Sequence, residues 1–307
     1  MRIIKPSFWE RKNFLAYLLS PLSLFAYLNY LIKKLTSKQK FSIKTICIGN
    51  IYVGGTGKTS LVIKINELLR KKFKTVFIKK KYTEQSDEIN LLRTKGNLIS
   101  KKERKEALLK AEKEKFQVAL LDDGLQQKNI HYDLKIVCFN SEAALGNNFL
   151  LPAGPLRESM NEIKNYDFAF LNGEKKNKKL YSKLKSINKK INIFEGKYTP
   201  INLSSFDLSK NYLMFCGIGN PEEFENTLKK YKFKIKEKLI FPDHYRFSTS
   251  EINKFKLIAN KKKLCLVTTE KDFLRLRKSE KKNIMHLKVE LTINKIDVFK
   301  KAIIKKL

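Results

Sequence analysis

The chain has 307 residues, of which 42% are hydrophobic, so it can bury a sizeable core and is not a wholly disordered protein. Its net charge of +35 favours anionic partners such as nucleotides, acidic lipid surfaces or nucleic acid, although lysines spread over solvated faces would give the same excess. Its four cysteines are widely spaced and three lie in apolar runs, which is typical of reduced core residues and excludes a disulfide framework.

The first long apolar segment, Phe14–Ile32, contains no charged residue and has basic residues on both sides. As a helix it would span roughly 28 Å at ~1.5 Å per residue, close to the thickness of a bilayer core. Pro21 would kink this helix, and no small-residue cleavage site follows, which argues against a secretory signal peptide. Three interpretations stay open: a membrane-surface or partly inserted hairpin, a buried core helix, and a true span, which the charge on both sides disfavours.

Residues 46–60 (ICIGNIYVGGTGKTS) are the most informative part of the sequence, because they read as strand, phosphate loop and helix. Backbone N–H groups of such a loop, and the helix N-terminus after it, bind phosphate oxygens. Lys58 can reach the β- and γ-phosphates, and the Thr59 hydroxyl can ligate Mg²⁺. Tyr52 replaces the first glycine of the generic motif, so an ordinary glycine-rich turn is the alternative. We expect the loop to bind ATP through Tyr52, Val53, Gly54, Gly55, Thr56, Gly57, Lys58 and Thr59.

After residue 36, short apolar runs alternate with charged helical stretches at the spacing of βαβ units. Strands are expected at residues 45–48, 75–78, 118–121, 135–139 and 167–171, and helices at 58–71, 88–93 and 102–115. Nearly continuous apolar strands are typical of a parallel sheet that is covered on both faces. The sequence therefore predicts an α/β fold, with a P-loop NTPase-like, mostly parallel sheet and helices on both faces.

A second, smaller α/β set follows a lysine-rich stretch at 175–190, which is expected to form an exposed helix or a joining segment. Its expected strands lie at 212–216, 264–268 and 286–291, and its helices at 222–230, 249–259 and 296–306. The predicted organisation is an N-terminal membrane-associating helical segment (1–36), a P-loop kinase domain (37–199) and a smaller C-terminal α/β domain (200–307).

Two adjacent carboxylates, Asp122 and Asp123, end the apolar run at 116–123 (FQVALLDD). A buried strand that ends in this way delivers an acid to the carboxyl edge of a parallel sheet, beside a phosphate loop. We expect Asp122 or Asp123 to hold Mg²⁺, directly or through water. The alternative is a strand that ends in an acidic turn.

Two motifs, DDGLQ at 122–126 and LPAGPLRE at 151–158, resemble those of the tetraacyldisaccharide 4′-kinase family, the membrane-bound kinases of lipid A synthesis. The loop GGTGKT at 54–59 is similar to that family's phosphate loop, which also lacks the first generic glycine. Further matches are GIGNP at 217–221, FPDH at 241–244 and TEKD at 269–272. The apolar N-terminal segment resembles the family's membrane-associating helix, so the resemblance covers nearly the whole chain.

The resemblance implies ATP- and Mg²⁺-dependent transfer of the γ-phosphoryl group to the 4′-hydroxyl of a tetraacylated glucosamine disaccharide 1-phosphate. It implies that Asp87 is the general base and that His244 pairs with it, as catalytic residues beside Lys58. It also adds Glu158 to the Mg²⁺ ligands Thr59, Asp122 and Asp123. Because phosphoryl transfer needs charge neutralisation, we expect Arg157 to be an additional clamp on a phosphate of ATP or of the substrate. Taken alone, Asp87 reads as a helix N-cap and His244 as a surface histidine.

Two departures from the family pattern stand out. The Ser-Arg-Gly-Tyr stretch of the family appears here as Lys79-Lys80-Lys81-Tyr82, which keeps positive charge at Lys80 and loses the glycine. The histidine that follows the DDGLQ motif in the family is Gln127 here, so any role of that histidine is lost or moved.

The leading hypothesis is a lipid kinase on the cytoplasmic face of the bacterial inner membrane, with the acylated disaccharide and the membrane surface as partners and no nucleic acid. The main alternative is a basic P-loop module that binds ATP on nucleic acid or a membrane without kinase activity. No motif of interleaved aromatic and basic residues supports RNA binding. A soluble P-loop kinase or ligase would leave the apolar N-terminal segment without a purpose.

Overall fold

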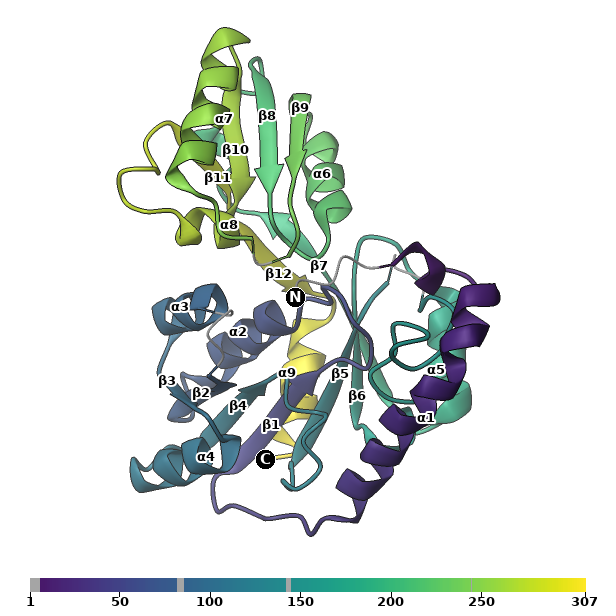
Figure 1. Ribbon diagram of the computed structural model, residues 1–307. Coiled ribbons are helices and arrows are strands. Elements are labelled where there is room, and N and C mark those ends of the chain that lie inside the picture. The colour runs from purple at the N-terminus through teal and green to yellow at the C-terminus, as the bar shows by residue number, and fades with distance from the viewer. Residues whose placement is uncertain (1–5, 82–85, 142–144, 244) are drawn as a thin grey trace. The chain divides into compact units, whose positions relative to one another are not determined.

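The computed structural model describes residues 6–81, 86–141, 145–243 and 245–307, which form two compact units (Figure 1). The larger unit consists of the described parts of Lys5–Tyr82, Leu92–Tyr198 and Leu291–Leu307. The smaller unit consists of the described parts of Thr83–Leu91 and Thr199–Glu290. Each unit has its own sheet and its own hydrophobic cores.

Among the described residues, an eight-stranded sheet forms the centre of the larger unit. Its strands are β1 (Lys44–Gly49), β2 (Thr75–Lys80), β3 (Leu98–Lys101), β4 (Val118–Asp122), β5 (Leu134–Asn140), β6 (Phe168–Asn172), β7 (Asn192–Pro200) and β12 (Val289–Ile293). The order is β12-β7-β6-β5-β1-β4-β2-β3, and all pairs from β7 to β3 are parallel. The predicted parallel sheet is therefore confirmed, with β1 between β4 and β5.

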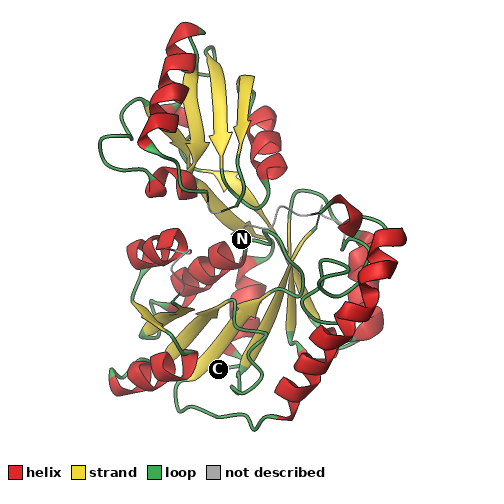
Figure 2. Ribbon diagram, viewed as in Figure 1, coloured by secondary structure: helices red, strands yellow, loops and turns green. Residues whose placement is uncertain are grey.

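The helices of the larger unit cover both faces of this sheet, as predicted (Figure 2). They are α1 (Phe14–Leu35), α2 (Lys58–Leu69), the end of α3 (Ser86–Lys95), α4 (Arg104–Lys113), α5 (Lys178–Ile187) and α9 (Ile296–Ile304). One core packs α4 and α5 on the sheet, and the other packs α2 and α9 on the opposite face. Successive strand residues alternate between the cores, since Cys47 lies in the first and Ile46 and Ile48 lie in the second.

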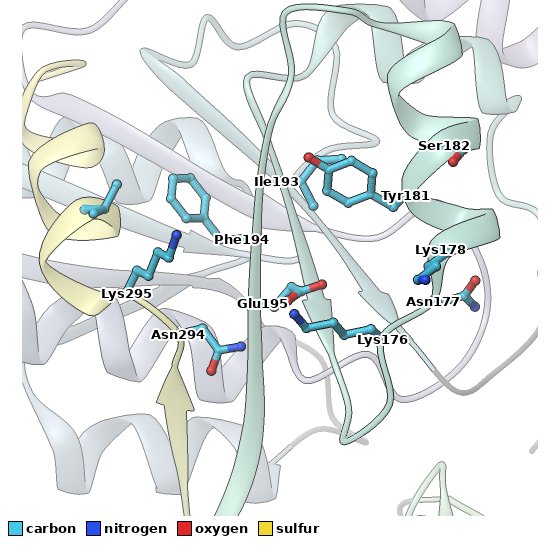
Figure 3. Close-up of a pocket in the computed structure, with 11 residues that line it drawn as sticks. Lys176, Asn177, Lys178, Tyr181, Ser182, Ile193, Phe194, Glu195, Asn294 and Lys295 are labelled. Carbon is cyan, nitrogen blue, oxygen red and sulfur yellow. The ribbon is translucent and has the colours of Figure 1, made fainter.

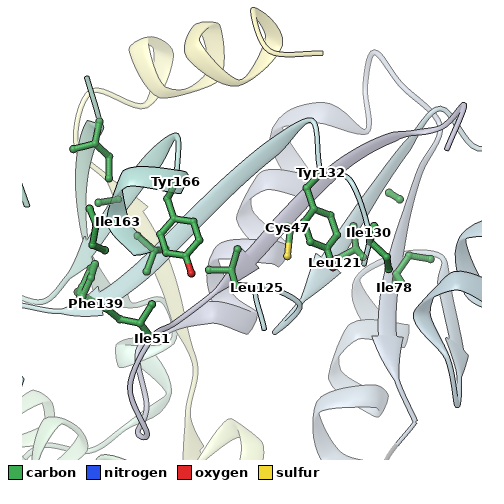
Figure 4. Packing of buried hydrophobic residues seen from close by; sticks show 14 of the residues in the cluster. Cys47, Ile51, Ile78, Leu121, Leu125, Ile130, Tyr132, Phe139, Ile163 and Tyr166 are labelled. Atoms are coloured by element: carbon green, nitrogen blue, oxygen red, sulfur yellow. The ribbon is translucent and has the colours of Figure 1, made fainter. Parts of the chain in front are cut away.

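The first of these cores is made largely of aliphatic and aromatic side chains, and Figure 4 shows Cys47 and Tyr132 close together in it. Burial raises the pKa of the Cys47 thiol to about 12, which keeps it protonated and unreactive. Cys138 and Cys216 are also fully buried, and all four cysteines are free, as the sequence predicts for reduced core residues.

The smaller unit has a four-stranded parallel sheet in the order β11-β10-β8-β9. Its elements are β8 (Asn211–Cys216), α6 (Pro221–Lys230), β9 (Lys234–Ile240), α7 (Thr249–Lys261), β10 (Cys265–Thr269), α8 (Glu270–Arg275) and β11 (Ile284–Leu287). Phe224 of α6 packs on one face and Phe255 of α7 on the other. The sequence did not indicate β9, because this edge strand reads KIKEKLI and buries none of its residues fully.

The observed units differ from the sequence-based division at the C-terminus. Residues 291–307 were expected in the C-terminal domain, but they group with the larger unit. The reason is the packing of α9, since the ring of Phe299 lies 4.8 Å from that of Phe194 on β7 and 6.1 Å from that of Phe170 on β6. The chain passes from the larger unit to the smaller unit between Tyr198 and Thr199, and α1 groups with the larger unit.

In the smaller unit, Asp272 joins two of the motifs that the sequence singles out. Its side chain is fully buried and accepts hydrogen bonds from the Gly217 N–H (3.1 Å) and the Thr269 hydroxyl (2.7 Å). Arg275 Nη1 lies 2.7 Å from the same carboxylate and also donates to the Gly217 carbonyl. Residues 217–221 and 269–272 therefore have a structural explanation, because one buried ion pair fixes both turns.

We predict that Asp272→Ala lowers the free energy of unfolding by about 3–5 kcal/mol, because it removes the buried carboxylate that Arg275, the Gly217 N–H and the Thr269 hydroxyl all contact. Urea unfolding followed by circular dichroism measures this loss. The matched control is Asp207→Ala in the same unit, which removes a half-exposed carboxylate and is expected to change stability little. Equal stability of the two variants would contradict the role assigned to Asp272.

Candidate active site

The phosphate loop connects the end of β1 to the start of α2 in the larger unit. Gly57 precedes the helix with φ = 78°, a left-handed conformation that favours glycine. A Cβ at this position would lie 2.8 Å from the Tyr198 hydroxyl and 2.9 Å from Asn172 Nδ2, so only glycine fits. The first N–H groups of α2 have no partner within the helix, which makes this end of the helix suitable for phosphate.

Tyr52, in place of the generic glycine, anchors the loop to the core. Its side chain is buried, its hydroxyl accepts a hydrogen bond from the Asn140 N–H (2.8 Å), and its ring stacks on Phe139 of β5. The Tyr52 side chain is therefore committed to the protein interior, and only its backbone remains for a nucleotide. The Thr56 hydroxyl, by contrast, is buried without a hydrogen-bond partner among the described residues.

The segment at 151–158 runs alongside the phosphate loop. The Val53 N–H donates to the Pro155 carbonyl, and the Arg157 N–H donates to the Ile51 carbonyl, both at 2.8 Å. Any side chain at Gly154 would collide with Asn147 and Phe149, which explains the glycine in this motif. The segment thus supports the loop and brings Arg157 to it.

Asp122 lies directly beside the helix that follows the phosphate loop. It is the last residue of β4, is fully buried, and pairs in register with Ile48 of β1. Its Oδ2 accepts from the Thr59 hydroxyl at 3.2 Å and lies 2.6 Å from Lys79 Nζ. Its Oδ1 has no hydrogen-bond partner among the described residues.

Asp123 faces cationic side chains from three elements. Its backbone has φ = 58°, and its carboxylate lies 3.7 Å from Lys58 Nζ and 3.1 Å from Arg157 Nη1. Burial raises the pKa of this carboxyl, but Lys58, Arg157 and Lys79 outweigh that effect and lower the pKa to about 2. Asp123 is therefore ionised at neutral pH.

Sequence reasoning missed two further residues that shape this site. Arg104 of α4 is buried and donates through Nη2 to the carbonyls of Asp122 (3.3 Å) and Asp123 (2.6 Å), so it fixes the turn after β4. Lys79 is buried against Asp122, although it belongs to a lysine run that looks like a solvated surface. The sequence singled out Lys79 only by its position just after the expected strand at 75–78 and by its place in the departure from the family pattern at 79–82.

Glu158 lies in a separate cluster of charged and aromatic side chains. One carboxylate oxygen is 2.7 Å from Lys128 Nζ, and the other accepts from the Tyr166 hydroxyl at 2.7 Å. Lys128 also pairs with Glu162, which accepts from the Tyr30 hydroxyl of α1. Both oxygens of Glu158 therefore have protein partners, and its expected role as a magnesium ligand would require one of these contacts to be exchanged.

The two residues expected to perform proton transfer are only partly covered by the structure. The backbone of Asp87 lies in the first turn of α3, and its side chain is outside the described residues, as is all of His244. Within the smaller unit, Lys271 Nζ lies 3.4 Å from Glu88, the residue after Asp87. The motif at 269–272 is thus close to the start of this helix.

The residues around Asp122 fit a magnesium ion. Asp122 Oδ1 is a buried acceptor without a partner, and the Thr59 hydroxyl adjoins the same carboxylate. No cluster of three or more His, Cys, Asp or Glu side chains suited to a metal occurs among the described residues. A site with so few protein ligands suits Mg²⁺, because this ion usually retains several coordinated waters and takes its other oxygen ligands from substrate phosphates.

A surface pocket of about 600 Å³ in the larger unit contains none of the predicted site residues (Figure 3). It is lined by residues of α5, β7, α9 and the segments just before the two helices, namely Lys176, Asn177, Lys178, Tyr181, Ser182, Ile193, Phe194, Glu195, Asn294, Lys295 and Val298. The phosphate loop contributes nothing to this pocket, so its size gives no support for nucleotide binding there.

The parallel sheet, the glycine-rich loop before α2 and the acid at the end of the neighbouring strand define a P-loop phosphotransferase. The family model for LpxK, tetraacyldisaccharide-1-P 4′-kinase, matches residues 15–92 and 77–307. The chain belongs to this kinase family.

Curated relatives agree with this assignment. A tetraacyldisaccharide 4′-kinase of Pelagibacter ubique is 47% identical over 301 residues, which cover 96% of this chain and 95% of the relative. One from Rickettsia canadensis is 36% identical, covering 100% and 98% of the two chains. The crystal structure of LpxK from Aquifex aeolicus, in complex with ATP, shares the fold with a TM-score of 0.67 at 24% identity, over 95% of this chain and 96% of that one.

We predict that metal-free protein loses about 2 kcal/mol of stability from Asp123 alone as the pH falls from about 4 to about 2. The pKa of Asp123 is about 2 in the folded state and 3.8 ordinarily, so its contribution is complete above pH 4 and is lost on protonation. Urea unfolding of wild type and Asp123→Asn at several pH values in EDTA measures the difference. A difference that stays constant down to pH 2 would contradict this electrostatic account.

Proposed function

We propose that this protein transfers the γ-phosphoryl group of ATP to the 4′-hydroxyl of a tetraacylated glucosamine disaccharide 1-phosphate. The observation that carries the proposal is the Thr59–Asp122 contact, which joins the phosphate loop to a buried acid in a chain of this kinase family. Phosphoryl transfer depends mainly on positioning and charge neutralisation, and the residues around the loop supply both.

The triphosphate would lie on the N-terminus of α2, with Lys58 against its β- and γ-phosphates. Arg157 adds a second cation, held in place by the backbone hydrogen bond to Ile51. Bound Mg²⁺, with Thr59 and Asp122 as its protein ligands, would neutralise charge on the phosphate oxygens. Asn172 adjoins Gly57 and has a buried amide without a partner among the described residues, so it offers a further contact.

Asp87 is the proposed general base for the acceptor, because a sugar hydroxyl needs a proton acceptor within about 3 Å during transfer. His244 is proposed to orient this carboxylate and to take up the proton. Both roles come from the family resemblance and are open to direct test by substitution.

We further propose that α1 binds the membrane surface that carries the acceptor. Phe14, Leu18 and Phe25 are 80%, 61% and 71% exposed, a large apolar surface that water disfavours. The helix is held to the larger unit by polar contacts, with the Ser23 hydroxyl donating to the Leu150 carbonyl at 2.8 Å. A pocket of about 310 Å³ lies between α1 and the 148–160 segment, lined by Tyr27, Asn148, Leu150, Leu156, Ser159, Met160 and Lys183.

We expect the purified chain in detergent to convert labelled ATP and a 1-phosphorylated acyl disaccharide into a bis-phosphorylated product. Lys58→Ala should lower the rate by about 10²–10³-fold, because it removes a cation from the charge that develops on the phosphates. Asp87→Ala should remove most turnover with the fold intact. Thin-layer separation of the labelled lipid gives the rates.

The control for this assay is Lys71→Ala, which removes an exposed charge just beyond α2 and should keep the wild-type rate. Absence of product with wild-type protein would refute the proposed reaction. A near wild-type rate for Asp87→Ala would refute only the assignment of the base, and a near wild-type rate for Lys58→Ala would refute the role of the loop.

Membrane binding can be tested on α1 separately. The triple substitution of Leu18, Phe25 and Ile32 by Ser should reduce co-sedimentation with anionic vesicles at least about tenfold, because it removes exposed apolar surface. The matched control substitutes Ile201, Leu257 and Val298, which are similarly exposed outside α1. Equal losses in both triple variants would show that binding does not depend on α1.

A further inference from the structure

Lys79 occupies an unusual place for a lysine. Its side chain is 3% exposed, whereas lysine is almost never fully buried unless it is paired. It lies near the end of β2, one residue after the Ile78–Leu121 pair that aligns this strand with β4. This register brings Lys79 Nζ to 2.6 Å from Asp122 Oδ2.

The two carboxylate oxygens of Asp122 have different surroundings. Oδ2 accepts from both Lys79 and the Thr59 hydroxyl, which together fix the orientation of the carboxylate. Oδ1 is left as the acceptor without a partner among the described residues. Lys79 therefore orients the Asp122 carboxylate, which the proposed function makes a ligand of Mg²⁺.

The charge around the loop is already positive before any metal binds. Lys58, Lys79, Arg104 and Arg157 all contact the Asp122–Asp123 turn, which carries only two carboxylates. An incoming triphosphate would thus meet excess positive charge, and a metal ion would meet an acid that is partly neutralised. At these separations of 2.6–3.7 Å between largely buried groups, such charges interact strongly.

We propose that Lys79 is a positioning residue that acts as a built-in cation at Asp122, so that ATP binding depends only weakly on Mg²⁺. This inference rests on the proposed binding of ATP at the loop. The resemblance places serine at this position in the family pattern, and Lys79 is part of the departure of this chain at residues 79–81. If Lys79 only stabilised the packing of β2 against β4, replacing it would not change how strongly ATP binding depends on Mg²⁺.

The test measures the dissociation constant of a fluorescent ATP analogue for the full chain in detergent, in EDTA and at saturating Mg²⁺. The ratio of the two constants is expected to stay below about tenfold for the wild type. Lys79→Met, which keeps the length and removes the charge, should raise this ratio at least about tenfold, because the triphosphate then meets one cation fewer. Lys79→Arg should restore a ratio close to that of wild type.

A second readout uses no nucleotide. Binding of Mn²⁺, followed by electron paramagnetic resonance, should be at least about tenfold tighter in Lys79→Met than in wild type, because Asp122 is no longer neutralised. The matched control is Lys101→Met on the neighbouring strand β3, which removes an exposed charge and should change neither measurement.

The outcomes separate this inference from the proposed function. Failure of wild-type protein to bind the analogue even with Mg²⁺ would refute the proposed function, and with it the inference. If wild-type protein binds the analogue with Mg²⁺ but its dissociation constant in EDTA is more than about tenfold higher, the inference is wrong and the proposed function is unaffected. This result does not depend on whether Lys79→Met folds. An unchanged ratio in folded Lys79→Met would overturn it as well.

Discussion

The pairing of β1 with β4 is the constraint on which the site depends. Ile48 and Asp122 are partners in the parallel register, so the strand that leads into the phosphate loop and the strand that ends in the acid finish at the same edge of the sheet. From that edge, α2 brings the Thr59 hydroxyl to the Asp122 carboxylate. A shift of one residue in this register would turn Asp122 to the opposite face of the sheet and separate it from Thr59.

Much of the fold could be predicted because the central strands are short, continuous apolar runs that glycines or charged helices interrupt. This pattern is typical of a parallel sheet buried on both faces, and it places β1, β2, β4, β5 and β6 within a few residues of their observed bounds. Strands away from the centre of each sheet gave a weaker signal. β9 reads KIKEKLI, with three lysines and a glutamate, and β7 contains a glycine and ends in a proline, so neither reads as a central strand.

The parts of the site that local sequence determines could be predicted, and the parts that depend on tertiary packing could not. The GKT turn and the Asp122–Asp123 pair follow from local sequence, whereas burial of a particular lysine or arginine is a tertiary property. With 65 lysines and arginines in the chain, nothing local distinguishes Lys79 and Arg104, which turn inward, from the many that remain in water. Tyr52 was misleading in the opposite sense, because its position in the motif suggests contact with phosphate while its side chain serves the core.

The segment from residue 147 to residue 162 connects the two surfaces that the proposed reaction needs. Through Pro155 and Arg157 it forms backbone hydrogen bonds with the phosphate loop, and through Leu150 and Glu162 it contacts α1. The phosphate loop and the apolar helix are thus fixed to the same stretch of chain rather than joined by a linker alone. If α1 binds the membrane as proposed, this segment would set the distance between the membrane surface, where the acceptor lies, and the phosphate that is transferred.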